Sequence, residues 1–157
     1  MKSKTNVMRI LEQAQVAYES IEYDLGVQDF SGEKVAEILG VCPEVMFKTL
    51  TGNGMKNGVG IFLIPVDHEL NLKYAASALK DKKVEMIPVK ELLSVTGYLR
   101  GEVSPIGMKK KYPIFIDDSA LSLEKIIVSG GKKGSSILIN SKELAEFLQA
   151  FFVPLVK

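Results

Sequence analysis

Residues 45–66, VMFKTLTGNGMKNGVGIFLIPV, contain two strand-like runs joined by a turn-forming segment. That segment, GNGMKNG (52–58), ends in Asn57-Gly58, a pair that favours a tight β-hairpin turn. The second run, GVGIFLIPV (58–66), is continuously apolar, as is typical of a strand buried on both faces. We therefore expect a hairpin whose second strand lies inside the fold.

Lys48 is the one charged residue in the first run, VMFKTL. Strand alternation places it on one face with Met46 and Leu50, while Phe47 and Thr49 point the other way. Burying an ammonium among apolar side chains is costly unless it reaches water, pairs, or meets an anionic ligand. Two interpretations stay open: a solvated lysine that discourages aggregation at a sheet edge, and a cation that binds an anion.

Helical and strand-like patterns alternate along the rest of the chain. Helices are predicted where apolar residues recur at helical spacing after a capping residue, with Thr5, Asn71 and Ser141 among the caps. The predicted helices cover 5–14, 31–40, 71–80, 88–97 and 141–152, and further strands cover 19–25, 84–87, 113–118, 125–129 and 135–139. Short turns join several successive strands, which predicts an α+β fold with a mixed, largely antiparallel sheet and helices around it.

Composition sets broad limits on the protein. A chain of 157 residues with 46% hydrophobic and 25% charged residues fits one soluble domain, which we expect to span 1–157. A single cysteine forms no internal disulfide, and the N-terminus lacks the apolar core of a signal peptide. The longest apolar run, IFLIPV (61–66), is too short to span a bilayer, so we expect a cytoplasmic protein without membrane association.

Several kinds of catalytic machinery have no support in the sequence. One histidine and one cysteine make no standard metal site, so we expect no metal and no cofactor. His68 is expected to face solvent, and Cys42 to be a half-buried structural residue. Asp117-Asp118 is interpreted as turn-forming because adjacent strand residues point to opposite faces. The glycine-rich segments 52–58 and 130–134 lack phosphate-loop spacing and are interpreted as hairpin turns.

The segment TGYLRGEVSPIGMKKKYPIFID (96–117) combines glycines, a proline and cations. Its Ser104-Pro105 pair lies between glycines, and Lys109, Lys110 and Lys111 follow directly. This arrangement suits a loop whose N–H groups hold a carbonyl or a phosphate with cations behind it, although a purely structural turn is the alternative. A second basic pair, Lys132 and Lys133, lies in another glycine-rich turn. Net charge is only +1, so phosphate binding would depend on these local clusters.

Motifs across nearly the whole chain resemble the YbaK/EbsC family of aminoacyl-tRNA deacylases, relatives of the editing domain of bacterial prolyl-tRNA synthetases. In family order, the matching motifs are KTNVMRILE, VAEILGVCPEVMFKTL, PVDHELNLKYAASAL, KKVEM, TGYLRGEVSPIGMKKKYPIFID and IIVSGGKKG. The resemblance implies a curved, mixed, almost barrel-like sheet surrounded by helices. It also implies removal of a wrongly attached amino acid from tRNA, typically cysteine from tRNA(Pro).

The resemblance also implies roles for individual residues. Lys48 corresponds to the family lysine that lines the pocket and faces the aminoacylated 3′ end. Gly101 corresponds to the loop glycine whose N–H stabilises an oxyanion, and Pro105 closes the same motif after Ser104. The resemblance implies that Gly101, Ser104 and Pro105 bind substrate. Tyr23 would lie beside the aminoacyl group. The five lysines of the two clusters are predicted to contact tRNA phosphates: Lys109, Lys110, Lys111, Lys132 and Lys133.

Two positions depart from the family pattern. Glu102 replaces the usual second glycine of the loop, and Ser136 replaces an acid in the strand after GGKKG. A hydroxyl can hydrogen-bond but cannot balance an ammonium, and Ser136 is predicted to bind substrate. The expected mechanism is attack by the substrate's own thiol, with release of a thiolactone. The alternatives are an Ala-tRNA(Pro) deacylase that uses water, a non-catalytic tRNA- or nucleotide-binding module, and a small-molecule hydrolase. The expected partner is aminoacyl-tRNA, with prolyl-tRNA synthetase as a candidate, and the protein is expected to be a monomer.

Overall fold

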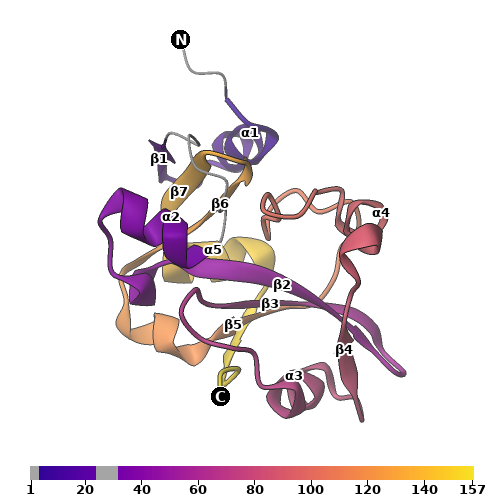
Figure 1. The fold of residues 1–157 in the computed structure, drawn as a ribbon. Helices are drawn as coiled ribbons and strands as arrows, with labels where there is room; N and C mark the ends of the chain where they lie inside the picture. Colours follow the sequence, from indigo (N-terminus) through magenta and orange to yellow (C-terminus); the bar gives the residue numbers. More distant parts are fainter. Residues whose placement is uncertain (1–3, 24–31) are drawn as a thin grey trace.

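The computed structural model describes residues 4–23 and 32–157 (Figure 1). Its helices are α1 (Asn6–Gln13), α2 (Gly32–Leu39), α3 (Leu72–Leu79), α4 (Leu92–Thr96) and α5 (Ser141–Leu148). Short 3-10 helices are η1 (Pro43–Val45), η2 (Val89–Glu91) and η3 (Asp118–Ser122). The strands are β1 (Tyr18–Glu22), β2 (Phe47–Gly54), β3 (Gly58–Pro65), β4 (Val84–Met86), β5 (Ile114–Asp117), β6 (Lys125–Lys132), β7 (Ser135–Asn140) and β8 (Phe151–Val153).

The strands form two sheets. The smaller sheet has the order β1-β7-β6 and is antiparallel throughout. The larger sheet has the order β4-β2-β3-β5-β8, in which β4, β2 and β3 are antiparallel and β5 and β8 continue in parallel. The predicted mixed α+β architecture is therefore confirmed.

The sheets meet at one edge and do not close into a barrel in the described ranges. A parallel bridge between Met46 and Ile127 connects the start of β2 to β6. A core cluster fills the space between the sheets, with Phe47 and Leu63 from the larger sheet and Val128 and Ile137 from the smaller one. The opposite face of the larger sheet packs against α3 (Figure 1). The expected single barrel-like sheet is thus corrected to two sheets that share one bridge.

The predicted hairpin of residues 45–66 is confirmed. β2 and β3 pair from Phe47↔Pro65 to Gly54↔Gly58, and Gly58 has a φ of +74°, which favours glycine. Asp81 stabilises the turn because its Oδ2 accepts hydrogen bonds from the N–H groups of Lys56 at 2.8 Å and Asn57 at 2.7 Å. The hairpin is thereby connected to the end of α3.

The C-terminal helix differs from its prediction. α5 ends at Leu148, and Gln149 follows in the left-handed conformation, so the chain leaves the helix before the two phenylalanines. Phe151 begins β8, where its ring stacks on Phe115 with centroids 6.2 Å apart. The N-cap is Asn140, whose side chain accepts from two backbone N–H groups, and not Ser141 as expected.

Other local predictions have mixed outcomes. Thr5 and Asn71 cap α1 and α3 as expected. Asp117 is buried and accepts hydrogen bonds from Ser119 N at 3.2 Å and Leu155 N at 2.9 Å, which confirms its turn-forming role. Cys42 is exposed and not half-buried, because it lies on the surface turn that leads into η1.

Two boundaries of predicted elements lie outside the described residues: the end of strand 19–25 and the start of helix 31–40. Over the described residues, no helix is long and apolar enough to cross a membrane.

Candidate functional site

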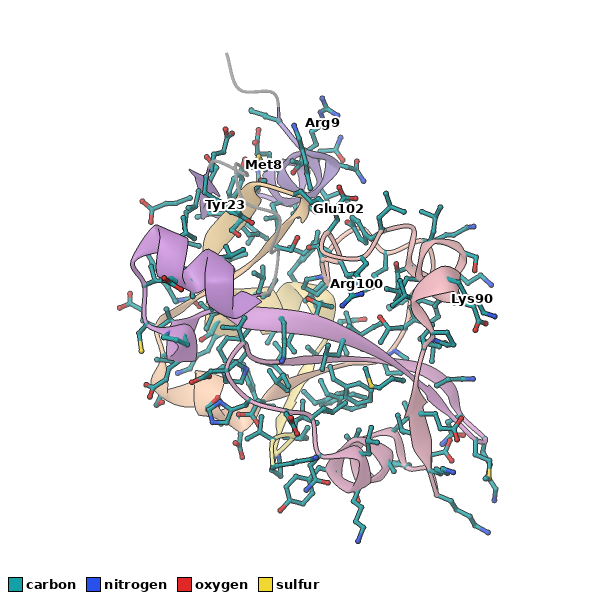
Figure 2. All side chains as sticks on the ribbon, in the orientation of Figure 1. Met8, Arg9, Tyr23, Lys90, Arg100 and Glu102 are labelled. Atoms are coloured by element: carbon teal, nitrogen blue, oxygen red, sulfur yellow. The ribbon has the colours of Figure 1, made fainter. Side chains whose placement is uncertain are left out.

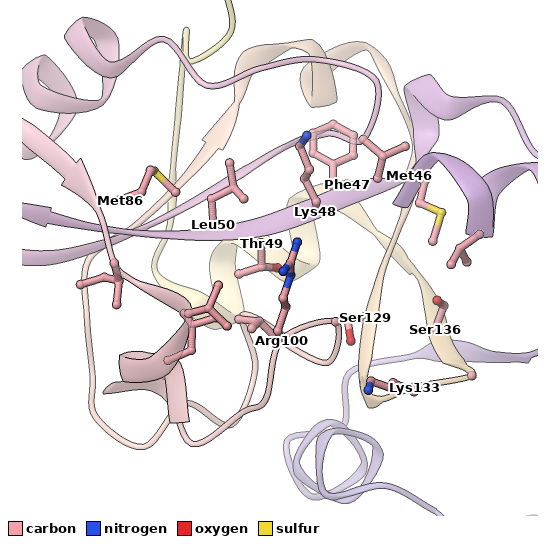
Figure 3. A pocket seen from close by; sticks show the side chains of 18 of the residues that line it. Met46, Phe47, Lys48, Thr49, Leu50, Met86, Arg100, Ser129, Lys133 and Ser136 are labelled. Atoms are coloured by element: carbon pink, nitrogen blue, oxygen red, sulfur yellow. The ribbon is translucent and has the colours of Figure 1, made fainter. Parts of the chain in front are cut away.

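A cavity of about 750 Å³ opens beside the first half of β2 (Figure 3). Its walls come from β2, from β4 and the η2–α4 segment, from the loop at residues 100–103, and from the β6–β7 hairpin. The lining residues are Tyr23, Val35, Met46, Phe47, Lys48, Thr49, Leu50, Val66, Met86, Ile87, Val89, Leu92, Arg100, Gly101, Val103, Ser129, Lys133, Gly134 and Ser136.

The cavity exists because β2 has an incomplete neighbour on one edge. Among the described residues, β4 pairs with β2 at Gly52–Gly54, and a bridge at Met46 joins the residue just before β2 to β6. Between these points the edge of β2 faces the loop that carries Arg100 and Gly101. The cavity therefore lies where β2 has no neighbouring strand along this edge.

Lys48 lies in this open part of β2, opposite Ile64 on β3. The residue is half-buried and lines the cavity. In the part of the chain that the structure describes, its ammonium has no ion pair or hydrogen bond. Figure 3 shows its side chain leaving β2 on the side away from Arg100 and Ser129. A half-buried cation that has no counter-charge among the described residues favours the anion-binding interpretation over the edge-protecting one.

Gly101 occupies a tight turn at the opposite wall. Its φ is +88°, and Glu102 N donates to Leu99 O across the turn at 3.0 Å. Ser129 Oγ donates to Glu102 O at 3.0 Å and accepts from Gly131 N at 3.1 Å. These bonds connect the Gly101 loop to β6. The loop glycine is therefore presented to the cavity on a braced turn.

Ser104 and Pro105 lie beneath this loop and not on the cavity wall. Both are buried, and Ser104 Oγ accepts from Ile106 N at 3.3 Å. The Tyr98 hydroxyl donates to Ile106 O, and burial raises the pKa of Tyr98 to about 12. Ser104 and Pro105, which are predicted to bind substrate, are thus buried outside the described cavity lining and support the loop.

The two residues that depart from the family pattern have different positions. Glu102 is absent from the cavity lining, and Figure 2 shows it toward α1 while Arg100 lies on the side facing β2. Ser136 lines the cavity from β7, directly opposite Ile21 on β1 and Ser129 on β6. A carboxylate at position 102 thus adds no negative wall to the cavity.

Tyr23 and Lys133 complete the end of the cavity near the β6–β7 hairpin. Tyr23 is half-buried, and its N–H donates to Gly134 O at 3.1 Å, which holds the residue after β1 against the hairpin. Lys133 is half-buried and lines the cavity. Tyr23 thus lines the same cavity as Lys48, Gly101 and Ser136.

The remaining predicted tRNA-binding lysines lie outside the cavity. Lys109, Lys110 and Lys132 are exposed. Lys111 is also exposed, and its Nζ donates to Gln149 Oε1 at 2.7 Å. These four cations are available to a ligand larger than the cavity, whereas Lys133 belongs to the cavity itself.

Sequence reasoning did not assign three kinds of lining residue. Arg100, although counted among the basic residues, extends toward β2 in Figure 3. Ser129 braces the Gly101 loop. An apolar wall comes from η2 and its neighbours, with Met86, Val89 and Leu92. Arg100 precedes Gly101 in the sequence, and Ser129 lies inside the IIVSGGKKG motif, so both could have been found from the motifs. No sequence pattern marks the residues of the apolar wall.

The chemistry of the lining is cationic, apolar and hydroxylic. Lys48, Arg100 and Lys133 contribute positive charge, and no Asp, Glu, His or Cys is among the described residues that line the cavity. None of the described lining residues is a general base that would make a hydroxyl group such as that of Ser129 a nucleophile. The site can bind an anionic ligand and stabilise a developing oxyanion, but its described side chains supply no activated nucleophile.

Comparison with known proteins identifies the family. Residues 29–147 match the model of the aminoacyl-tRNA editing domain. An Enterococcus faecalis protein named "Putative Cys-tRNA(Pro)/Cys-tRNA(Cys) deacylase EbsC" is 45% identical over 136 residues, covering 87% of this chain and 83% of that protein. A proline–tRNA ligase of Kosmotoga olearia is 35% identical over 102 residues, which are 65% of this chain and 17% of the ligase.

A solved structure described as "a putative trans-editing enzyme for prolyl tRNA synthetase" shares the fold. It has a TM-score of 0.83 and 21% identity, with 99% of each chain covered. The match over residues 29–147 and the 45% identity to the Enterococcus faecalis protein show the family. This chain therefore belongs to the aminoacyl-tRNA editing domain family and is an enzyme that edits aminoacyl-tRNA by deacylation.

Proposed function

We propose that this protein removes cysteine from Cys-tRNA(Pro), with the substrate's own thiol as the nucleophile. The observation that carries the proposal is the composition of the cavity: over its described lining there is no carboxylate, imidazole or thiol to attack the ester or to activate water. A cysteinyl ester brings a thiol to the site. The name of the Enterococcus faecalis relative supports the same substrate class.

The proposed step balances without a cofactor. The cysteinyl sulfur attacks the ester carbonyl carbon as its proton is lost, and a C–S bond forms. The bond between that carbon and the ribose oxygen then breaks, and the ribose oxygen takes up a proton. The products are tRNA with a free terminal hydroxyl and a four-membered thiolactone, which water opens to cysteine.

Roles for the cavity residues follow from their positions. The Gly101 N–H lies on a braced turn and would donate to the oxyanion as the carbonyl becomes tetrahedral. Lys48, on the far side of the β2 edge from Arg100, would bind the terminal phosphate or orient the ribose (Figure 3). Tyr23 and Ser136 would enclose the aminoacyl group, and holding sulfur near the carbonyl contributes through proximity.

A second substrate remains a candidate because the cavity also contains small hydroxylic side chains. Ser129 and Ser136 face each other across β6 and β7. They could hold a water molecule near the ester of Ala-tRNA(Pro), although no described lining residue would act as its base.

We further propose that the protein acts as a cytoplasmic single-domain monomer alongside a prolyl-tRNA synthetase.

Deacylation rates on purified tRNA(Pro) charged with cysteine, alanine, serine or proline test the proposal. Cysteine should be released much faster than serine, because a hydroxyl is a far weaker nucleophile than a thiolate. Equal rates on Cys-tRNA and Ala-tRNA would contradict an obligatory thiol and favour water. Binding of tRNA without any deacylation would favour a non-catalytic module.

A further inference from the structure

The direction of the backbone groups along β2 is fixed by its hydrogen bonds. Val66 N donates to Met46 O at 2.8 Å on the β3 side, and Ile87 N donates to Thr51 O at 3.0 Å on the β4 side. In a strand, the N–H and C=O of alternate residues point to the same edge. Even-numbered residues therefore bond to β3, and odd-numbered residues point to the other edge.

Thr49 lies at the centre of the part of this edge that has no neighbouring strand. On one side of the gap, Met46 is bridged to Ile127 of β6. On the other side, Ile87, which follows β4, donates a hydrogen bond to Thr51 O. By the alternation along β2, Thr49 makes no main-chain bond to β3; among the described residues, the pairing with β4 stops at Gly52, the bridge to β6 is at Met46, and no loop residue bonds to the Thr49 N–H or C=O. The Thr49 side chain adds a second unsatisfied group, because its Oγ1 is shielded from water and has no partner. Unpaired backbone groups of this kind are costly unless water or a ligand satisfies them.

The gap is too short for a peptide strand. It spans Lys48 to Leu50, about 10 Å of strand, and the Arg100–Val103 loop and the η2–α4 segment limit it on the other side. A planar heterocycle with a donor beside an acceptor fits such a space. Apolar walls from Ile87, Val89 and Leu92 suit the ring faces. The exposed Arg100 guanidinium, which extends toward Thr49 in Figure 3, can stack on a base.

We infer that the main chain of Thr49 reads the adenine of the terminal adenosine, with its N–H donating to a ring nitrogen and its C=O accepting from the exocyclic amine. This inference rests on the proposed function, because tRNA carries its aminoacyl ester on that adenosine. It deepens that function by assigning a base-reading edge to the same cavity. The base would lie between β2 and the η2–α4 wall, and the ester would reach toward Gly101.

Two measurements on the wild-type protein test the inference. In the first, Cys-tRNA(Pro) is prepared with adenosine, purine riboside or inosine as the terminal nucleoside. Purine riboside lacks the exocyclic amine, and inosine has a carbonyl in its place. Either change should lower kcat/KM by about tenfold or more, as expected when one of two hydrogen bonds to the base is lost. In the second, exchange of the Thr49 amide hydrogen is followed by NMR with adenosine 5′-monophosphate and with inosine 5′-monophosphate. The adenine nucleotide should slow exchange, and the hypoxanthine nucleotide should leave it unchanged.

The outcomes separate this inference from the proposed function. Equal kcat/KM for all three terminal nucleosides, together with an unchanged Thr49 amide, would overturn the inference while leaving deacylation intact. Protection of the Thr49 amide by adenosine monophosphate in a protein that deacylates no tRNA would support the adenine site and contradict the proposed function.

A pair of variants gives a further check. Thr49→Pro removes the edge N–H without removing a bond to β3, and should abolish the preference for adenosine over inosine. Thr49→Val removes only the hydroxyl and should keep that preference ratio. A retained preference in a folded Thr49→Pro protein would contradict the inference. If that variant fails to fold, the nucleoside series decides.

Discussion

Ser129 and Ser136 stand directly opposite each other on β6 and β7, and only Ser129 reaches across to the loop that carries Gly101. Its hydroxyl donates to Glu102 O and accepts from Gly131 N. One serine of the pair therefore braces the oxyanion loop, while its neighbour lines the cavity. The β6–β7 hairpin thus serves the site both as wall and as support.

Ser129→Ala should lower kcat more than it raises KM. The substitution leaves Glu102 O without its donor and Gly131 N without its acceptor, so the Gly101 N–H becomes less well positioned. Loss of about one hydrogen bond's contribution to positioning corresponds to roughly a tenfold decrease in kcat. The measurement is steady-state deacylation of Cys-tRNA(Pro). Ser122→Ala is the matched control, because Ser122 also donates to a main-chain carbonyl but lies outside the cavity lining. Equal kcat in the wild type and Ser129→Ala would contradict the bracing role.

Lys48→Ala should reduce deacylation strongly while the protein stays folded. The ammonium lacks a counter-charge among the described residues, so its removal takes away ligand binding more than it disturbs packing. Loss of a charged hydrogen bond to substrate predicts a decrease in kcat/KM of about 10-fold to 100-fold. Lys73→Ala, an exposed lysine on α3, provides the control for loss of one positive charge. Wild-type kcat/KM in a Lys48→Ala protein with an unchanged circular dichroism spectrum would exclude the proposed role.

Replacing Lys109, Lys110 and Lys132 with Gln should weaken tRNA binding and flatten its salt dependence. Each lost phosphate contact lowers the slope of log K against log salt concentration by about 0.7 to 0.9. These three lysines are chosen because Lys111 bonds to Gln149 and Lys133 lines the cavity. Affinity is measured by filter binding at several salt concentrations. A control triple variant, in which Lys73, Lys80 and Lys142 are replaced with Gln, makes the same change in net charge at other exposed positions. The same slope in both triple variants would mean that the chosen cluster has no specific role.

Asp81 should make the stability of the β2–β3 hairpin depend on pH. Hydrogen bonds from backbone N–H groups, first that of Asn57 and then that of Lys56, lower the pKa of this carboxyl. Because the folded pKa is depressed, the stabilisation is fully present above the unfolded pKa, near 3.8, and is lost as pH falls through the folded pKa. The difference in free energy of unfolding between wild type and Asp81→Ala should therefore be larger at pH 7 than at pH 2.5. Urea denaturation at the two pH values measures it, and a difference independent of pH would contradict the prediction.

Local features were predictable because they depend on neighbours in sequence. The Thr5 and Asn71 caps and the Asn57-Gly58 turn each involve residues a few positions apart. The end of α5 was harder to predict, because Phe151 belongs to β8, where it pairs with and stacks on Phe115, a residue 36 positions earlier. A helical pattern in the sequence cannot express that competition.

The site was predictable where a motif contains the residue and less so where strand ends define it. Four residues that the motifs singled out, Lys48, Gly101, Tyr23 and Ser136, line one cavity. The open edge at Thr49 arises because two strands from distant parts of the chain stop short of it. No periodicity marks such a gap, so the edge and its apolar wall emerge only in three dimensions.

The proposed thiol attack is tested most directly by the first product released from Cys-tRNA(Pro). A rapid-quench reaction, with products separated and weighed by mass spectrometry, should show a species one water molecule lighter than cysteine before free cysteine accumulates. Its amount should rise and fall while intact tRNA(Pro) with a free terminal hydroxyl appears at the rate of deacylation. Free cysteine as the first product, together with equally fast release of alanine from Ala-tRNA(Pro), would contradict the mechanism and show that the cavity delivers water to the ester.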